Sequence, residues 1–137
     1  MAIVVCDDIR REASGKDILI GTYAGNIVVA QYPFKIRLAF WVEYQADRAG
    51  EHVIKLRVTY SGKAPGEVTI NAQIPESGTV TLPLTGLEVN GDAAGELTID
   101  HLSDEQDWQR VKTITVRKGA VTGLAAPTMA PPSVRMN

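Results

Sequence analysis

Large apolar residues recur at every second position in four stretches of this chain, at residues 36–44, 54–60, 67–74 and 79–85. Successive side chains of a β-strand point to opposite faces of the sheet, so a period of two predicts strands with one buried face. The apolar spacing of an amphipathic helix does not persist for three turns anywhere in the sequence. The chain is therefore expected to be all-β.

Shorter apolar runs bounded by turn residues complete the predicted strands, at residues 2–6, 18–23, 27–30, 97–99 and 111–116. Eight or nine short strands of this kind predict a two-sheet antiparallel β-sandwich, either immunoglobulin-like or C2-like. The stretches 36–44 and 54–60 are expected to pair as an antiparallel hairpin, because a connection containing Gly50 separates them.

Two residues are expected to disturb the last alternating stretch. Pro83 cannot donate a ladder hydrogen bond and predicts an edge strand or a bulge, and Gly86 predicts a kink. The alternation also assigns a core, which is expected to contain Ile20, Leu38, Phe40, Val42, Ile54, Leu56, Val58, Val68, Ile70, Ile74, Leu82 and Ile99.

A change in composition divides the chain into a sandwich domain at residues 1–119 and a tail at residues 120–137. The tail is rich in proline and alanine and contains no acidic residue, which favours an extended conformation. We expect it to lie along its own sandwich or a neighbouring copy, with apolar contacts from Val121, Leu124, Met129 and Val134.

The most distinctive local pattern is at the start of the chain. An apolar run ends in Cys6-Asp7-Asp8, and Arg10, Glu12 and Gly15-Lys16 follow before the next apolar run, which contains Leu19-Ile20-Gly21 and Tyr23. This pattern resembles the start of a family of small bacterial proteins of unknown function. The segment 50–56 (GEHVIKL) and the segment 95–99 (GELTI) also match that family. The resemblance implies a β-sandwich over residues 2–117 and no particular activity.

The charged residues of this opening are open to two interpretations. As a structural network, Asp7, Asp8, Arg10, Glu12 and Lys16 fix the pairing of the first two strands, since a carboxylate beside an arginine suits bidentate hydrogen bonding. As a site, paired carboxylates serve acid–base or metal chemistry. The interleaved basic residues neutralise the carboxylates, so we favour the structural network.

Acidic residues near the end of the sandwich are the weak candidates for a metal site. Calcium takes six to eight oxygen ligands, which the loops at a sandwich end often supply. The candidates are Asp100, Asp104 and Asp107, with Glu105 and Asp92 as further donors. Their spacing matches no calcium loop, and His52 and His101 have no partner at zinc spacing, so no metal or cofactor is expected.

Nucleophilic chemistry finds little support in the sequence. The single cysteine, Cys6, is followed by two aspartates, which raise a thiol pKa, so it is expected to be a buried small residue. A nucleophile elbow and a phosphate-binding loop are both missing from the sequence.

Trp41 has the opposite parity to Phe40 and Val42. It is an exposed anchor for a partner, a residue covered by the terminal tail or a crossing loop, or part of a core on both faces of the strand.

Charge and composition narrow the possible partners. The formal net charge is −2, which disfavours binding to nucleic acid. No apolar run approaches the length of a membrane span, and the N-terminus does not resemble a secretory signal, so a cytoplasmic location away from membranes is expected. A single cysteine fits a reducing compartment.

These observations favour a non-enzymatic interaction or assembly module that binds a protein partner or itself. The alternative is a sandwich that binds Ca²⁺ or a small polar ligand through its acidic end loops. A hydrolase without a recognisable motif is the third hypothesis.

Overall fold

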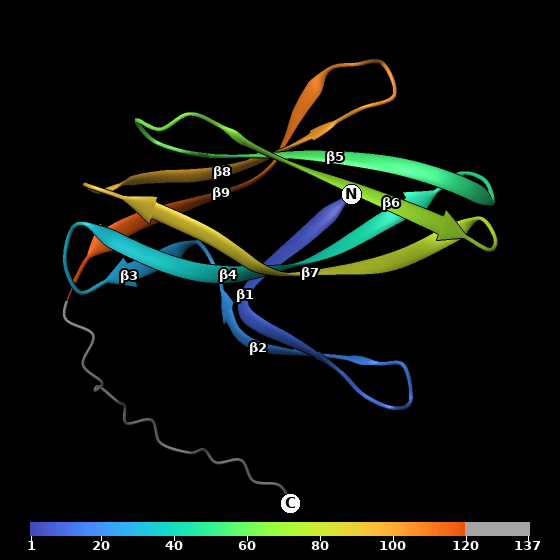
Figure 1. Ribbon diagram of the computed structural model, residues 1–137, viewed down its shortest axis with the longest axis horizontal. Coiled ribbons are helices and arrows are strands. Elements are labelled where there is room, and N and C mark those ends of the chain that lie inside the picture. The colour runs from blue at the N-terminus through green and yellow to red at the C-terminus, as the bar shows by residue number, and fades with distance from the viewer. Residues whose placement is uncertain (120–137) are drawn as a thin grey trace, which may run out of the picture.

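The computed structural model describes residues 1–119, which form nine strands in two packed sheets (Figure 1). The strands are β1 (Ala2–Arg11), β2 (Asp17–Tyr23), β3 (Asn26–Val29), β4 (Phe34–Ala46), β5 (Gly50–Tyr60), β6 (Gly66–Ile74), β7 (Gly78–Gly91), β8 (Gly95–Leu102) and β9 (Trp108–Lys118). The prediction of an all-β sandwich is therefore confirmed. Residues 1–119 contain no helix that is long and apolar enough to cross a membrane.

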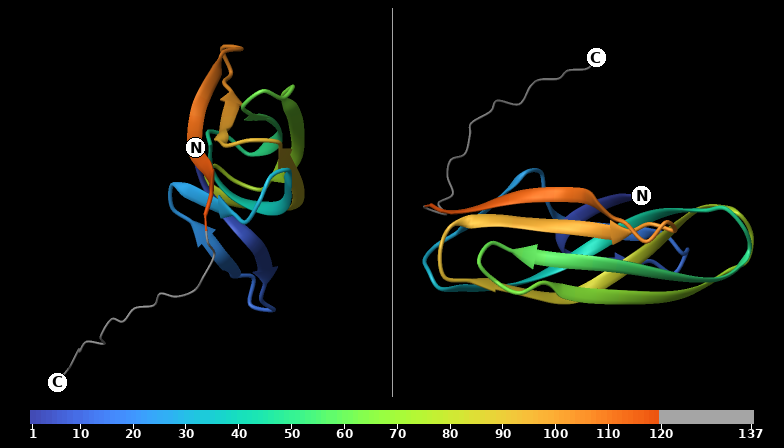
Figure 2. Two further views of the ribbon diagram at one scale, coloured as in Figure 1. Left: turned by 90° about the vertical axis from the view of Figure 1, so that its left-hand side faces the viewer. Right: turned by 90° about the horizontal axis from the view of Figure 1, so that it is seen from above.

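Each sheet combines strands from distant parts of the chain. One sheet has the order β2-β1-β4-β7 and the other has the order β3-β9-β8-β5-β6. All pairs are antiparallel except β3 and β9, which run parallel. Hairpins within one sheet join β1 to β2, β5 to β6 and β8 to β9, and the other connections cross between the sheets (Figure 2).

The predicted hairpin between residues 36–44 and 54–60 is wrong. β4 pairs with β1 and β7, whereas β5 pairs with β6 and β8 in the opposite sheet. The buried ring of His52 contacts the connection between β4 and β5, because its Nε2 lies 2.8 Å from the Arg48 carbonyl oxygen and its Nδ1 lies 2.9 Å from the Tyr44 hydroxyl. Alternation identifies the buried face of each of these two strands, and that face is the same in a hairpin and in two strands of opposite sheets.

The core lies between the two sheets and agrees with most of the predicted set. Leu38, Phe40, Val42, Ile54, Leu56, Ile74 and Ile99 are buried. Val58, Val68, Ile70 and Leu82 are partly buried against them. Ile20 is a wrong prediction, because 43% of its surface is exposed on β2, beyond the part of the sheet that the second sheet covers.

β7 is an edge strand and is kinked, as Pro83 and Gly86 predicted. Leu38 pairs with Leu87 and Phe40 pairs with Leu84, so one extra residue of β7 lies between these pairs. Gly86 adopts a φ of 73° at this bulge, a conformation that glycine adopts without steric cost. The predicted tail contacts of Val121, Leu124, Met129 and Val134 lie outside the described residues.

Candidate functional site

The β1–β2 hairpin extends away from the rest of the sandwich (Figures 1 and 2). Its two strands stay paired to their ends, with Asp8 opposite Ile20 and Arg10 opposite Ile18. A short turn closes it, in which the Glu12 amide donates to the Lys16 carbonyl at 2.8 Å. The opening signature therefore occupies one structural unit that projects from the fold.

The hairpin leaves the sandwich at Asp7 and Gly21. Gly21 has a φ of 69°, and a Cβ atom there would collide with Oδ2 of Asp7. The Asp7 carboxylate thus occupies the space that any larger residue at position 21 would need. Its Oδ1 accepts a hydrogen bond from the Tyr23 hydroxyl. Burial, with the added effect of Asp7, raises the pKa of Tyr23 to about 12.

The predicted signature residues form separate pairs instead of one network. Asp8 accepts a 2.8 Å hydrogen bond from Arg10, which holds the pKa of the Asp8 carboxyl below its usual range. Glu12 accepts a hydrogen bond from the Ser14 hydroxyl at 3.1 Å. Lys16 contributes its backbone carbonyl to the turn.

Asp17 forms a second ion pair within the hairpin and also connects the hairpin to the outer face of its own sheet. Arg11 Nε lies 2.9 Å from Asp17 Oδ1, and Trp41 Nε1 donates to Asp17 Oδ2 at 3.1 Å. The hydrogen bond from Arg11, with that from Trp41, lowers the pKa of the Asp17 carboxyl. Arg11 was absent from the predicted network, and no regular spacing signals its pairing with Asp17 in the sequence.

Trp41 belongs to a small apolar cluster on the outer face of this sheet. Cys6, Ile9 and Ala39 are buried there, and Leu19 of β2 packs against them together with Trp41. Burial raises the pKa of the Cys6 thiol. Trp41 is half-buried and donates to Asp17 of the hairpin, and its role as an anchor for a partner stays a prediction.

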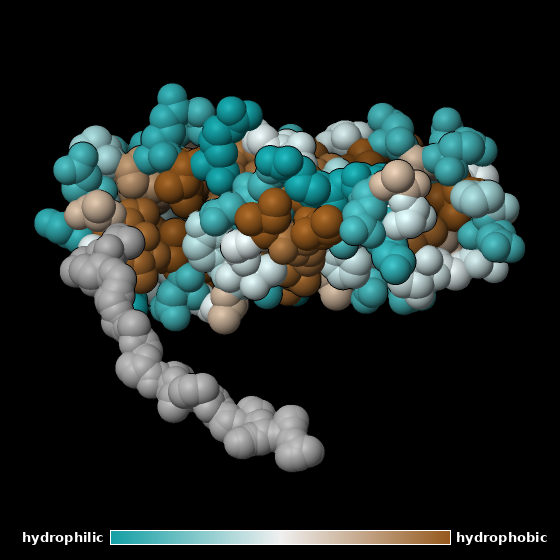
Figure 3. All heavy atoms as spheres, turned by 90° about the horizontal axis from the view of Figure 1, so that it is seen from below, coloured by the Kyte–Doolittle hydropathy of each residue, from teal (hydrophilic) through white to brown (hydrophobic). Residues whose placement is uncertain are grey.

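Within residues 1–119, no other segment covers the opposite face of β2. Ile18 and Ile20 are 45% and 43% exposed, and they lie two residues apart on the outermost strand of the four-stranded sheet. Apolar side chains gather among polar ones on the face of the molecule that carries the hairpin (Figure 3). This strand has an unpaired outer edge within residues 1–119 and an exposed apolar face, and it is the first candidate for a functional surface.

A cleft between the sheets is the second candidate. β6 and β7 meet at the turn of residues 75–77 and then diverge as the edge strands of opposite sheets (Figure 1). Between them lies a cleft of about 380 Å³. Its apolar lining consists of Val58, Tyr60, Ala64, Val68, Leu87, Val89 and Leu97, and its polar lining includes Lys63, Glu67, Glu88 and Asn90.

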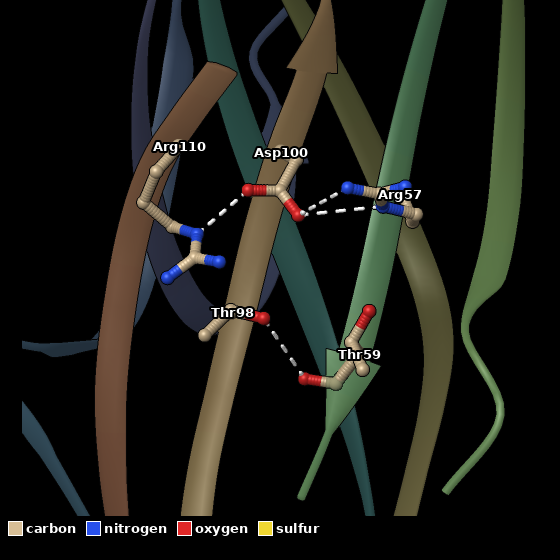
Figure 4. A network of polar contacts seen from close by, with 5 residues as sticks. All are labelled: Arg57, Thr59, Thr98, Asp100 and Arg110. Atoms are coloured by element: carbon tan, nitrogen blue, oxygen red, sulfur yellow. Dashed lines mark hydrogen bonds and ion pairs between the residues drawn. The ribbon is translucent and has the colours of Figure 1, made fainter. Parts of the chain in front are cut away.

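Asp100 binds two arginines on the outer face of the five-stranded sheet (Figure 4). Arg110 Nε lies 2.6 Å from Oδ1, and Arg57 Nη2 lies 3.3 Å from Oδ2. A bulge in β9 places Arg110 opposite Asp100, and the Arg57 guanidinium stacks 4.4 Å above the Trp108 ring. The Asp100 carboxylate is therefore already neutralised by two cations.

The acidic metal candidates do not converge. Asp104 and Asp107 lie in the β8–β9 turn, while Asp92 lies at the other end of β8 and pairs with Lys63 at 3.2 Å. Within residues 1–119, no group of three or more potential metal-ligating side chains comes together. A smaller hollow of about 230 Å³ beside this turn combines Asp104 with Lys55, Ser103 and Gln106.

Comparisons with known proteins add no relative, because no family model, curated protein or solved structure matches the chain. The resemblance of the opening residues to a family of small bacterial proteins stays a prediction.

Proposed function

We propose that this chain is a non-enzymatic assembly module that associates with copies of itself through edge strand β2. The observation that carries the proposal is the exposure of Ile18 and Ile20 on an outermost strand. An unpaired strand edge with apolar side chains is a template for pairing with another chain.

The other three edge strands have protective features that β2 lacks. β7 contains Pro83 and the Gly86 bulge, and β3 is only four residues long. The solvent-facing residues of β6 are Glu67, Thr69, Asn71 and Gln73. β2 spans seven residues without a proline, a lysine or an arginine. Short length, proline, bulges and charge are the usual means by which proteins prevent edge pairing.

Sedimentation of the full chain tests the proposal. The wild type is expected to form species heavier than the monomer as its concentration rises, and the double variant Ile18→Lys/Ile20→Lys is expected to lose them. Val53→Lys is the matched control, because Val53 is 58% exposed on a strand of the other sheet. A wild type that stays monomeric up to its solubility limit contradicts the proposal.

Truncation after Gly119 separates β2 from the predicted tail contacts at Val121, Leu124 and Met129. If the truncated chain still associates, the contact lies within residues 1–119, as proposed. If truncation abolishes association and the β2 variant retains it, the tail is the assembly element and β2 is not.

The 230 Å³ hollow beside the β8–β9 turn supports a second candidate function, the binding of a small polar ligand. Lys55 and Asp104 supply opposite charges there, which suits a zwitterion better than a calcium ion, since calcium requires several oxygen donors. A ligand that binds only the folded state must raise the melting temperature. The melting temperature is measured with glycine against buffer and with CaCl₂ against EDTA. An unchanged melting temperature with both glycine and CaCl₂ argues against this site.

A further inference from the structure

We propose that the cleft between β6 and β7 of one copy receives strand β2 of a second copy, with Ile18 and Ile20 as the side chains that enter it. This inference rests on the proposed function, because it identifies the surface that β2 contacts. It makes the two candidate surfaces the two halves of one interface.

The spacing of the apolar residues supports this pairing. Ile18 and Ile20 are separated by two residues on β2, as are Leu87 and Val89 on β7. Residues two apart on a strand lie on the same face at a separation of about 6.8 Å. A strand added beside β7 therefore places two isoleucines in step with Leu87 and Val89, over the apolar lining of the cleft.

The backbone of β7 provides the matching edge. Residues 87–90 pair regularly with β4 on one side, and the cleft lies beside the same residues. The bulge at Gly86 and the missing N–H of Pro83 confine any added strand to this part of β7. Addition of β2 extends the four-stranded sheet of one copy into that of the next, and main-chain hydrogen bonds form along both edges.

The charges next to the two surfaces have opposite signs. Lys16 directly precedes β2, whereas Arg10, which lies opposite Ile18 on β1, is already paired with Asp8 at 2.8 Å. Glu67 lines the cleft on the β6 side, and Glu88 on the β7 side is already paired with Lys35 at 3.5 Å, so Lys16 and Glu67 are the complementary charges. Opposite charges around an apolar contact favour correct docking and disfavour other orientations.

The proposed contact is heterologous, because β2 and the cleft are different surfaces of the molecule. Such contacts produce rings or open chains and leave one free surface of each kind in a dimer. Pairing of β2 with β2 is the competing arrangement, and it is isologous. The two arrangements predict different behaviour when defective variants are mixed.

The experiment uses full-length chains carrying one defect each. Ile18→Lys/Ile20→Lys removes the exposed apolar side chains of β2 and keeps the cleft. Ala64→Trp fills the cleft from an exposed loop position and keeps β2, and Glu67→Lys reverses a charge at its rim. Far-UV circular dichroism verifies that each variant folds. Sedimentation is then measured for each variant alone and for equimolar mixtures.

The expected result is the loss of heavier species in each variant alone and the appearance of a dimer when the β2 variant is mixed with Ala64→Trp. Each partner then contributes its one intact half. Self-association of both Ala64→Trp and Glu67→Lys at the wild-type level overturns this inference and leaves the proposed role of β2 standing. A mixture that stays monomeric also overturns it. Wild-type association of the β2 variant overturns the proposed function itself.

Discussion

The contact between Asp7 and Gly21 leads to a sharp stability prediction. Gly21 and Gly15 both have positive φ, at 69° and 91°. A Cβ atom at Gly21 would collide with the Asp7 carboxylate, whereas one at Gly15 would have no other atom within 4 Å. Gly15→Ala therefore reports the backbone strain alone, and Gly21→Ala reports the strain together with displacement of Asp7.

The structure gives the expected magnitudes. An L-residue in the left-handed region costs roughly 1–2 kcal/mol, which is the expected loss for Gly15→Ala. At Gly21 the new methyl group displaces Asp7 from its hydrogen bond with Tyr23. Loss of a hydrogen bond at a protein surface costs about 1 kcal/mol. The free energy of unfolding should therefore fall by about 2–3 kcal/mol for Gly21→Ala.

Urea unfolding followed by circular dichroism measures both variants, with linear extrapolation to water. Asp7→Ala and the double variant Asp7→Ala/Gly21→Ala are measured in the same way. The double variant removes the collision, so its loss of unfolding free energy should be smaller than the sum of the losses for Asp7→Ala and Gly21→Ala. Equal losses for Gly21→Ala and Gly15→Ala, together with additivity in the double variant, would refute the proposed contact.

Three further predictions concern the core, the arginine pair and the tyrosine. Leu56→Ala should lower the unfolding free energy by about 2–5 kcal/mol in urea titrations, because Leu56 is fully buried. Asp100→Asn should cost about 1.5–3 kcal/mol by the same method, since it weakens charge-assisted bonds to two arginines, while Asp104→Asn in the exposed turn should change little. The pKa of Tyr23 is raised from 10 to about 12, so its contribution to stability is present below pH 10 and is lost as the pH rises toward 12. Wild type should therefore lose more stability than Tyr23→Phe across that interval in urea titrations at fixed pH.

The fold class was predictable because alternation records which face of each strand is buried. Phe40, Leu56 and Ile99 share this pattern with their neighbours, and all three are fully buried between the sheets. Alternation carries no information on which strands are paired. The segments 36–44 and 54–60 satisfy it equally well as a hairpin or as strands of opposite sheets, and in the structure they pair with other strands in opposite sheets.

The candidate surfaces were less predictable, because each depends on contacts between distant segments. Ile20 follows the same apolar pattern as a core residue, yet it is exposed where the hairpin passes the edge of the second sheet. Trp41 has the parity of an outward residue, yet it bonds to Asp17 and packs against the same cluster as Leu19, residues 22 or more positions away in the sequence. The cleft between β6 and β7 follows from the sheet topology, which no local pattern encodes.

We propose that the signature at the start of the chain serves architecture and that a binding role belongs to the residues next to it. Asp7 fills the space beside Gly21 and accepts the Tyr23 hydrogen bond, so these three residues are in contact where the hairpin leaves the sandwich. Asp17 then attaches the hairpin to Trp41. Once both attachments are made, one face of β2 is used and the other, with Ile18 and Ile20, faces outward. The signature residues thus lie within the hairpin and its attachments, and Ile18 and Ile20 are the residues that stay available to a partner.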